Sequence, residues 1–279
     1  MGKTSKSEMI LEVASRFKTG RGFVKTKKSL KFDIEQVKIE ILSDEVSKEI
    51  GREKGNYISF NFDELLYFDA KAKNYLCKRI CDCIKELLKK NKIILGKVLV
   101  VGLGNYAYAC DSLGSKVVQK VLITKPYLEK NLFSKEQVAE VYAVSMGVYG
   151  TTGLDSSEVI NSICKFLKPN LVVVIDSMVA SDEKRLAKSI QISDTKLLPG
   201  GGVGNARKEI SKENVGAPIF AVGVPFVVNT QNICNVSQNL IVTPKDIENK
   251  VKAASNIIAK ALNLAFNNLT ENEIAELTE

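Results

Sequence analysis

Histidine is absent from the 279-residue sequence. Its absence excludes Ser-His-Asp and Cys-His catalysis, zinc sites with histidine ligands, and acid–base chemistry by an imidazole group. In an enzyme of this composition, proton transfer must fall to carboxylates, lysine, tyrosine or cysteine. Any catalytic hypothesis for this chain therefore starts from those side chains.

Long apolar runs and targeting signals are also missing. A membrane-spanning helix needs about 18 consecutive apolar residues. The longest candidate, residues 217–228, is shorter and contains Pro218 and Pro225. The N-terminus lacks a signal-peptide pattern, and Lys6 stands where a myristoylation motif has Ser or Thr. We therefore expect a cytoplasmic protein.

Cysteine is present but follows no disulfide or metal-binding pattern. None of the six cysteines forms a CxxC pair; they lie at positions 77, 81, 83, 110, 164 and 234. In a chain of this length without an export signal, we expect reduced and partly buried thiols. The sequence predicts no cofactor and no cysteine metal site.

Positive charge is concentrated near the N-terminus. Residues 1–31 contain nine Lys or Arg against Glu8 and Glu12, which accounts for nearly all of the net charge of +8. We interpret residues 1–34 as a mobile or loosely helical basic arm. Such an arm can contact nucleic acid or be a solvated tail, and the sequence favours the tail.

The remaining sequence indicates a mixed fold with a substantial core, since 45% of residues are apolar. Apolar runs typical of central parallel strands occur at 97–101, 171–175 and 219–224, and alternating strands at 37–41 and 56–62. Helical spacing predicts helices at 70–90, 111–120, 155–167 and 245–266. Their alternation predicts an α/β fold, a doubly wound and mostly parallel sheet with helices on both faces, over a single domain at 35–279.

Acidic residues follow the predicted parallel strands, where open sheets bind their ligands. Asp176 directly follows the strand 171–175, and Asp111 opens the helix after the loop Gly102-Leu103-Gly104-Asn105. Each also has a structural explanation, because Asp111 can cap its helix and Asp176 can cap the adjoining loop. Asp194 is a third candidate, whose alternative is a turn aspartate.

A pair of aspartates can hydrolyse an amide without histidine, metal or cofactor. Two carboxyl groups within about 3 Å share one proton, because both cannot ionise at that distance. The ionised group takes a proton from water while the protonated group donates to the scissile carbonyl. This chemistry suits the composition of the chain.

Two glycine-rich segments do not match nucleotide-binding motifs. The loop at 102–105 lacks the GxGxxG spacing because position 107 is alanine, and the segment PGGGVGN at 199–205 is not followed by the Gly-Lys-Ser/Thr of a P-loop. The second segment is either an active-site loop whose amides stabilise an oxyanion or a tight surface turn.

Six blocks, in the same order, resemble the germination protease family over about residues 36–265. They are VLVVGLGN at 98–105 with DSLG at 111–114, GVYGTTG at 147–153, IDS at 175–177, IQISDT at 190–195 with PGGGVGN at 199–205 and RKE at 207–209, GVP at 223–225 with VV at 227–228, and LIVTPK at 240–245.

The resemblance implies an atypical aspartic endopeptidase of spore germination that acts on small acid-soluble spore proteins, which coat DNA. It also implies a fold similar to hydrogenase maturation proteases, and a homotetrameric zymogen in the spore core. The two family aspartates fall on Asp111 and Asp176, which are therefore the expected catalytic residues. Supporting or substrate-binding roles are expected for Asp194, Asn105, Gly202, Gly204 and Arg207.

The chain departs from the family pattern in several places. Ala109-Cys110 replaces Thr-Pro before the first aspartate, Lys196 replaces a glycine, and Asn229 replaces an aspartate. No family-type mature start follows the arm. Three hypotheses remain: an active endopeptidase, a catalytically weak paralogue that binds a spore protein or DNA, and metal binding by the carboxylate cluster.

Overall fold

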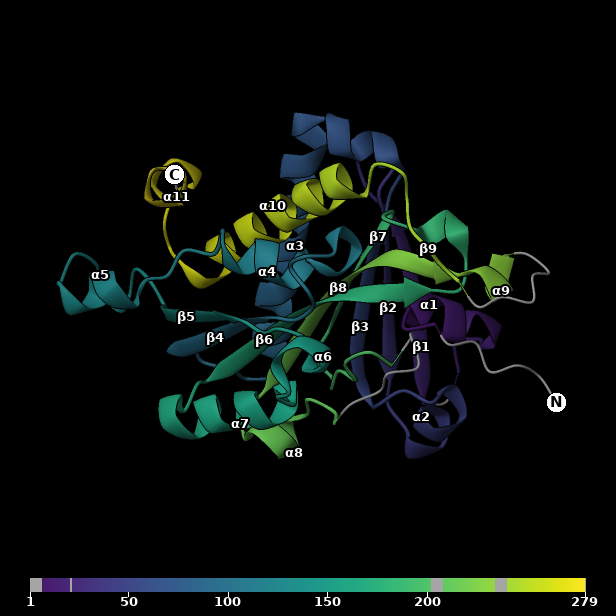
Figure 1. Ribbon diagram of the computed structural model, residues 1–279, viewed down its shortest axis with the longest axis horizontal. Helices are drawn as coiled ribbons and strands as arrows, with labels where there is room; N and C mark the ends of the chain where they lie inside the picture. Colours follow the sequence, from purple (N-terminus) through teal and green to yellow (C-terminus); the bar gives the residue numbers. More distant parts are fainter. Residues whose placement is uncertain (1–6, 21, 202–207, 234–239, 279) are drawn as a thin grey trace.

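The computed structural model describes residues 7–20, 22–201, 208–233 and 240–278. Within these residues, a nine-stranded sheet carries helices on both faces (Figure 1), so the predicted α/β fold is confirmed. The strands are β1 Phe23–Ser29, β2 Glu35–Ile41, β3 Gly55–Asn61, β4 Lys97–Gly102, β5 Glu140–Ser145, β6 Leu171–Ala180, β7 Ser189–Ser193, β8 Ile219–Asn229 and β9 Ile241–Val242.

One half of the sheet is parallel and holds the three strands predicted from continuous apolar runs. The order β8-β6-β4-β5 is parallel throughout, with Val98 of β4 opposite Leu171 of β6 on one side and Val141 of β5 on the other. The chain leaves β4 toward β5 and returns to β6 on the opposite side. The sheet therefore reverses its winding at β4, the position where open α/β sheets place their ligands.

The other half of the sheet is antiparallel and was only partly predicted. Its order is β1-β2-β3-β7, and β7 joins it to β8 by a further antiparallel pairing. β2 alternates as expected of a half-buried strand, with Val37, Ile39 and Ile41 buried. The strands β1, β5, β7 and β9 were not predicted.

Helices α3 (Ala70–Lys90), α4 (Leu113–Val118) and α10 (Ile247–Phe266) cover one face, and α7 (Ser156–Leu167) and α8 (Lys212–Val215) cover the other (Figure 1). In β6, Val173 packs toward the first group and Val172 toward the second, as strand alternation requires. The remaining helices are α1 Ile10–Val13, α2 Asp44–Ile50, α5 Lys125–Glu129, α6 Tyr149–Thr152, α9 Thr230–Ile233 and α11 Glu271–Thr278, with 3₁₀ turns η1 Ala14–Arg16, η2 Glu64–Phe68, η3 Ala109–Asp111 and η4 Glu183–Arg185.

Helix α3 begins and ends at the predicted residues, 70 and 90. Asp69 fixes its start, because Oδ1 accepts hydrogen bonds from the N–H groups of Lys71 (2.8 Å) and Ala72 (3.0 Å). None of the described helices combines the length and apolar character that would carry it across a bilayer.

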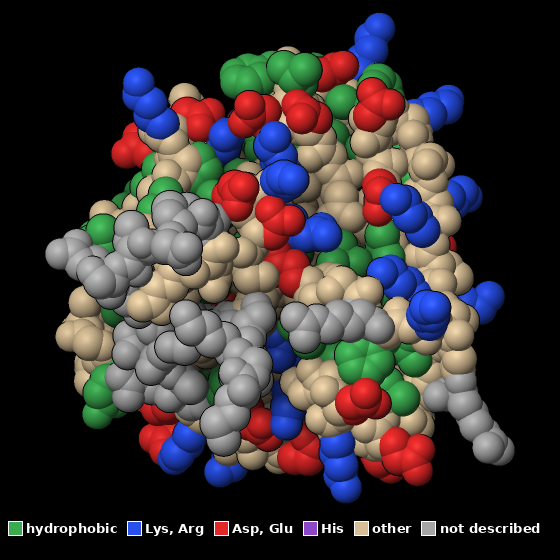
Figure 2. All heavy atoms as spheres, turned by 90° about the vertical axis from the view of Figure 1, so that its right-hand side faces the viewer, with side chains coloured by type: hydrophobic (Ala, Val, Ile, Leu, Met, Phe, Trp, Pro, Cys, Tyr) green, Lys and Arg blue, Asp and Glu red, His purple; other side chains and the backbone are tan. Residues whose placement is uncertain are grey.

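The described part of the predicted basic arm is packed against the body, which corrects the prediction of a mobile segment. Ile10, Leu11 and Phe23 are buried in a cluster with β2, and residues 23–29 form β1. The prediction failed because the arm's charges, such as Lys27 paired with Glu35 at 2.7 Å, lie in the part of the arm that stays exposed, while its apolar residues are buried. On the face in Figure 2, Lys and Arg side chains are interspersed with Asp and Glu.

The five cysteines that the structure describes carry free thiols. Cys110 is half-buried, and Cys77, Cys81, Cys83 and Cys164 are buried. Cys234 lies outside the described residues.

Candidate functional site

The carboxyl ends of β4 and β6 border a cavity of about 640 Å³, and both Asp111 and Asp176 lie in its wall. Segments from all six sequence blocks meet here, although they are spread over more than a hundred residues of chain. Besides the two aspartates, the lining includes Gly104, Asn105, Gly147, Gly150, Pro199, Gly200, Val227 and Ile241. We refer to it as the switch-point cavity.

Asp176 lies inside β6 and not at its end, which corrects the predicted strand boundary. β4 pairs with β6 only as far as Ile175, opposite Gly102, whereas β8 continues to pair with β6 up to Ala180. Asp176 is therefore the first residue of β6 beyond the β4 pairing. It is 9% exposed and shares the face of Val172 and Val174 by strand alternation.

Asp111 is the last residue of the 3₁₀ turn η3, two residues before α4. Its carboxylate turns to the loop rather than to the helix, because Oδ2 accepts the Asn105 N–H at 2.8 Å. Gly104 has a φ of +104°, and a Cβ there would lie 2.0 Å from the Asp111 carbonyl oxygen. Only glycine fits this approach, which locks the loop against Asp111.

A second close approach fixes the start of α4 on the end of β4. A Cβ at Gly114 would lie 2.4 Å from both the N and the O of Leu103, and a Cβ at Gly102 would lie 2.2 Å from the Gly114 oxygen. Backbone therefore touches backbone. This contact determines where the turn that carries Asp111 stands relative to β6.

Both carboxyl groups hold their proton more tightly than a solvated aspartate. Burial raises the pKa of Asp176 well above its ordinary value of 3.8, and the negative charges of Glu8 and then Asp111 raise it further, against a hydrogen bond from the Ser177 N–H. Burial also raises the pKa of Asp111, and the Asn105 N–H opposes this shift. Pairs of acids with shifted pKa values are characteristic of catalytic sites.

Glu8 is a third carboxylate in the cavity wall that the sequence analysis did not assign. Its N–H donates to the Val179 carbonyl (2.9 Å), and its Oε2 accepts the Val179 N–H (2.8 Å). Glu12 similarly accepts the Ser181 N–H at 2.7 Å. The sequence offers one indication of this role, because Glu8 and Glu12 are the two acidic residues in an N-terminal segment that is otherwise strongly basic.

A neighbouring cavity of about 440 Å³ lies on the other side of Asp176. Asp176 and Glu8 line both cavities, and the second one adds charged side chains such as Arg52, Glu53 and Lys196. An extended chain lying across both cavities would pass over Asp176.

Asp194 lies outside the lining of both cavities. Its carboxylate accepts hydrogen bonds from the Asn56 N–H and the Asn56 side-chain amide, both at 2.6 Å, and from the Asn91 amide at 2.8 Å. These contacts tie β3 to the end of α3. Asn105 lies in the switch-point cavity, whereas Gly202, Gly204 and Arg207 fall outside the described residues.

Among the positions that depart from the family pattern, Cys110 lines the switch-point cavity, and burial raises the pKa of its thiol. Lys196 forms an ion pair with Glu209 at 2.7 Å, and Asn229 is buried at the end of β8. The described residues contain no group of three or more Cys, Asp or Glu side chains arranged to hold a metal ion.

The fold and the carboxylates at its switch point define an α/β protein with an acidic site, and comparison with known families places it among the peptidases. The chain belongs to the germination protease family, whose model matches residues 7–237. This range includes Glu8, Asp111 and Asp176.

Relatives named germination protease cover most of the chain. The protein of Clostridium acetobutylicum is 32% identical over 280 residues, covering 84% of this chain and 85% of the relative. That of Caldanaerobacter subterraneus subsp. tengcongensis is 32% identical and covers 88% of each chain. Among solved structures, a NiFe hydrogenase maturation protease from Thermococcus kodakarensis is similar, with 19% identity, a TM-score of 0.36, and coverage of 64% of this chain and 98% of that one.

Proposed function

We propose that this germination protease is an aspartic endopeptidase in which Asp111 and Asp176 share one proton. The observation that carries the proposal is that both side chains line one cavity and that burial raises the pKa of each. In a chain without histidine, such a pair supplies both the acid and the base.

The surroundings of the two aspartates suggest their roles. Asp176 is the more deeply buried and has two acidic neighbours, so it holds the shared proton and donates it to the scissile carbonyl. Asp111 accepts a backbone N–H that favours its ionised form, so it removes a proton from water. The water oxygen bonds to the carbonyl carbon. The C–N bond then breaks as the amide nitrogen receives that proton from Asp111 and leaves as an amine, and the former carbonyl oxygen returns its proton to Asp176.

Ser177 supplies a hydroxyl next to the pair. Its Oγ is buried without a hydrogen-bond partner among the described residues, and Ser177 lines the switch-point cavity. Because an unpaired buried hydroxyl is unfavourable, a bound water or substrate carbonyl is the natural partner.

For the substrate, the proposal follows the family resemblance to small acid-soluble spore proteins in the spore core. The two cavities that meet at Asp176 provide room for an extended polypeptide on both sides of the scissile bond. The proposal includes the family's homotetramer. It also includes activation by N-terminal processing, since Glu8 forms hydrogen bonds with the backbone of Val179, close to Asp176 in the same strand.

The test is cleavage of a small acid-soluble spore protein by Asp111→Asn and Asp176→Asn variants. Each substitution is expected to lower kcat by roughly 100- to 10,000-fold, the range supplied by general acid–base catalysis. Asp82→Asn, an exposed carboxylate on α3, is the matched control. Full turnover by either site variant would reject the pair, while substrate binding without cleavage in the wild type would identify the weak paralogue.

A further inference from the structure

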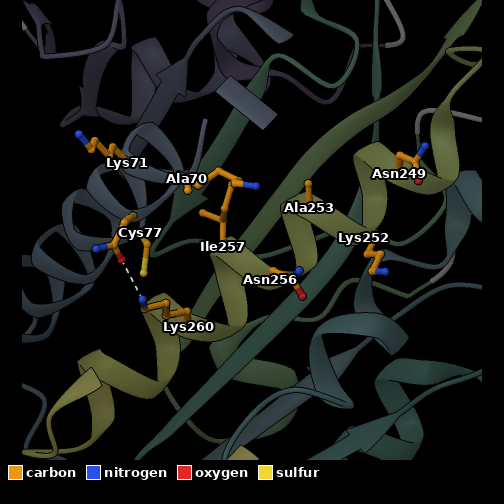
Figure 3. A pocket seen from close by; sticks show the side chains of 11 residues that line it. Ala70, Lys71, Cys77, Asn249, Lys252, Ala253, Asn256, Ile257 and Lys260 are labelled. Carbon is orange, nitrogen blue, oxygen red and sulfur yellow. Dashed lines mark hydrogen bonds between the residues drawn. The ribbon is translucent and has the colours of Figure 1, made fainter. Parts of the chain in front are cut away.

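A third hollow lies between α3 and α10, on the helical face of the sheet that carries α4 (Figure 3). It has a volume of about 560 Å³ and shares no lining residue with the switch-point cavity. Lys71 lies on its α3 side and Lys252 on its α10 side, with Ala253 and Ile257 between them. We call it the α3–α10 pocket.

The charge in this pocket has one sign. Its described lining contains four lysines and no acidic residue; the lysines are Lys71, Lys73, Lys252 and Lys260. Lys260 is neutralised by Glu271 at 2.6 Å. The other three form no ion pair with any residue that the structure describes, although ion pairs engage many other cations in the described part of the chain.

The positive field extends beyond the lining. Lys120 lies next to the pocket and donates to the side chains of Ser255 (2.9 Å) and Asn256 (2.5 Å), which are neutral. Burial lowers its pKa, and the charges of Lys116 and Lys252 lower it further. An anion in the pocket would relieve this repulsion, because like charges at short range destabilise each other.

The chemistry of the lining suits phosphate. Lysine offers a compact point charge that binds phosphate oxygens, and a ligand with several negative charges can engage more than one of these lysines. Ala253, Ile257 and Cys77 provide an apolar wall beside the charges. We propose that the α3–α10 pocket binds a small ligand that carries more than one phosphate group, at a site separate from the proteolytic one.

The test is calorimetric titration of the intact protein with inorganic tripolyphosphate at constant ionic strength, with sulfate and a short DNA duplex as further probes. We expect tripolyphosphate to bind the wild type at a single site. The triple variant Lys71→Gln, Lys73→Gln, Lys252→Gln should bind about 30-fold more weakly, because each of the three lost charges contributes roughly threefold. Ala253→Glu, which keeps every lysine, should also weaken binding.

The matched control removes three exposed lysines elsewhere, Lys28, Lys130 and Lys165. It should change tripolyphosphate affinity by less than about twofold, because distant surface charges are screened. No binding by the wild type, or equal losses in both triple variants, would overturn the proposal. Binding of the duplex alone would overturn it in favour of a nucleic-acid surface.

Discussion

The contact between β4 and α4 allows a sharp prediction about how Asp111 is positioned. In a Gly114→Ala variant, the new Cβ would lie 2.4 Å from Leu103 N and O and 2.7 Å from Gly102 C. All three atoms belong to the backbone, so no flexible side chain can move aside. The start of α4 must therefore shift away from β4.

The size of this shift follows from the same distances. Ordinary contact begins at 3.4 Å, so the two backbones must separate by about 1 Å at Gly114. Overpacking of this kind costs about 1–3 kcal/mol of unfolding free energy. A displacement near 1 Å of a catalytic group can lower kcat by about 100-fold. Because Asp111 lies three residues before Gly114, we expect both effects.

The assay combines urea unfolding with cleavage kinetics corrected for the folded fraction. Gly20→Ala is the control, since a Cβ at Gly20 meets its nearest atom at an ordinary 3.8 Å. A Gly114→Ala protein with wild-type stability would contradict the close approach. One that is destabilised but keeps its full kcat would show that this contact does not position Asp111.

Three further predictions concern single side chains. The folded protein raises the pKa of Asp176 above 3.8, so the native state binds the carboxyl proton more tightly than the unfolded state does. The stability that this proton contributes is lost as pH rises from about 3.8 through the folded pKa. At pH 7, Asp176→Asn should therefore unfold at a higher urea concentration than the wild type, and near pH 3.5 the two proteins should unfold at similar urea concentrations. Equal midpoints at both pH values would refute the burial argument. Glu8→Gln removes a charge that raises the same pKa, so the limb of the pH–rate profile that reports Asp176 should move to lower pH, and an unmoved limb would separate Glu8 from the site. Asp69→Ala removes the cap of α3 and should cost about 1 kcal/mol in urea unfolding, which an unchanged midpoint would contradict.

The parts of the fold that sequence could predict are those determined by local patterns. Helix α3 combines an amphipathic stripe with a capping aspartate, so the sequence predicts where the helix begins and ends. The central strands β4, β6 and β8 are continuous apolar runs because helices cover both their faces. The meeting of Asp111 and Asp176 in one cavity was also foreseeable, since each follows an apolar run of a predicted parallel strand and such runs end at the same edge of the sheet.

The parts that sequence could not predict depend on distant partners. β1 carries three lysines, one threonine and one serine, all exposed or half-exposed, and only one buried residue, Phe23, so its identity as a strand comes from pairing with β2. β7 is buried along its whole length although it contains Ser189, Gln191 and Ser193, because it lies between β3 and β8. Polar residues at such positions carry no local strand signal.

The position of Glu8 follows from the topology of the site itself. Because β4 stops pairing at Ile175, the edge of β6 beyond Asp176 would be left with open backbone groups, which are unfavourable when buried. The N-terminal segment covers this edge, as the two hydrogen bonds between Glu8 and Val179 demonstrate. The same break in pairing thus creates both the crevice for the aspartates and a backbone edge that a substrate strand could use. On the proposed function, an extended substrate can pair with that edge only after the segment around Glu8 has moved, which couples proteolysis to the N-terminal segment.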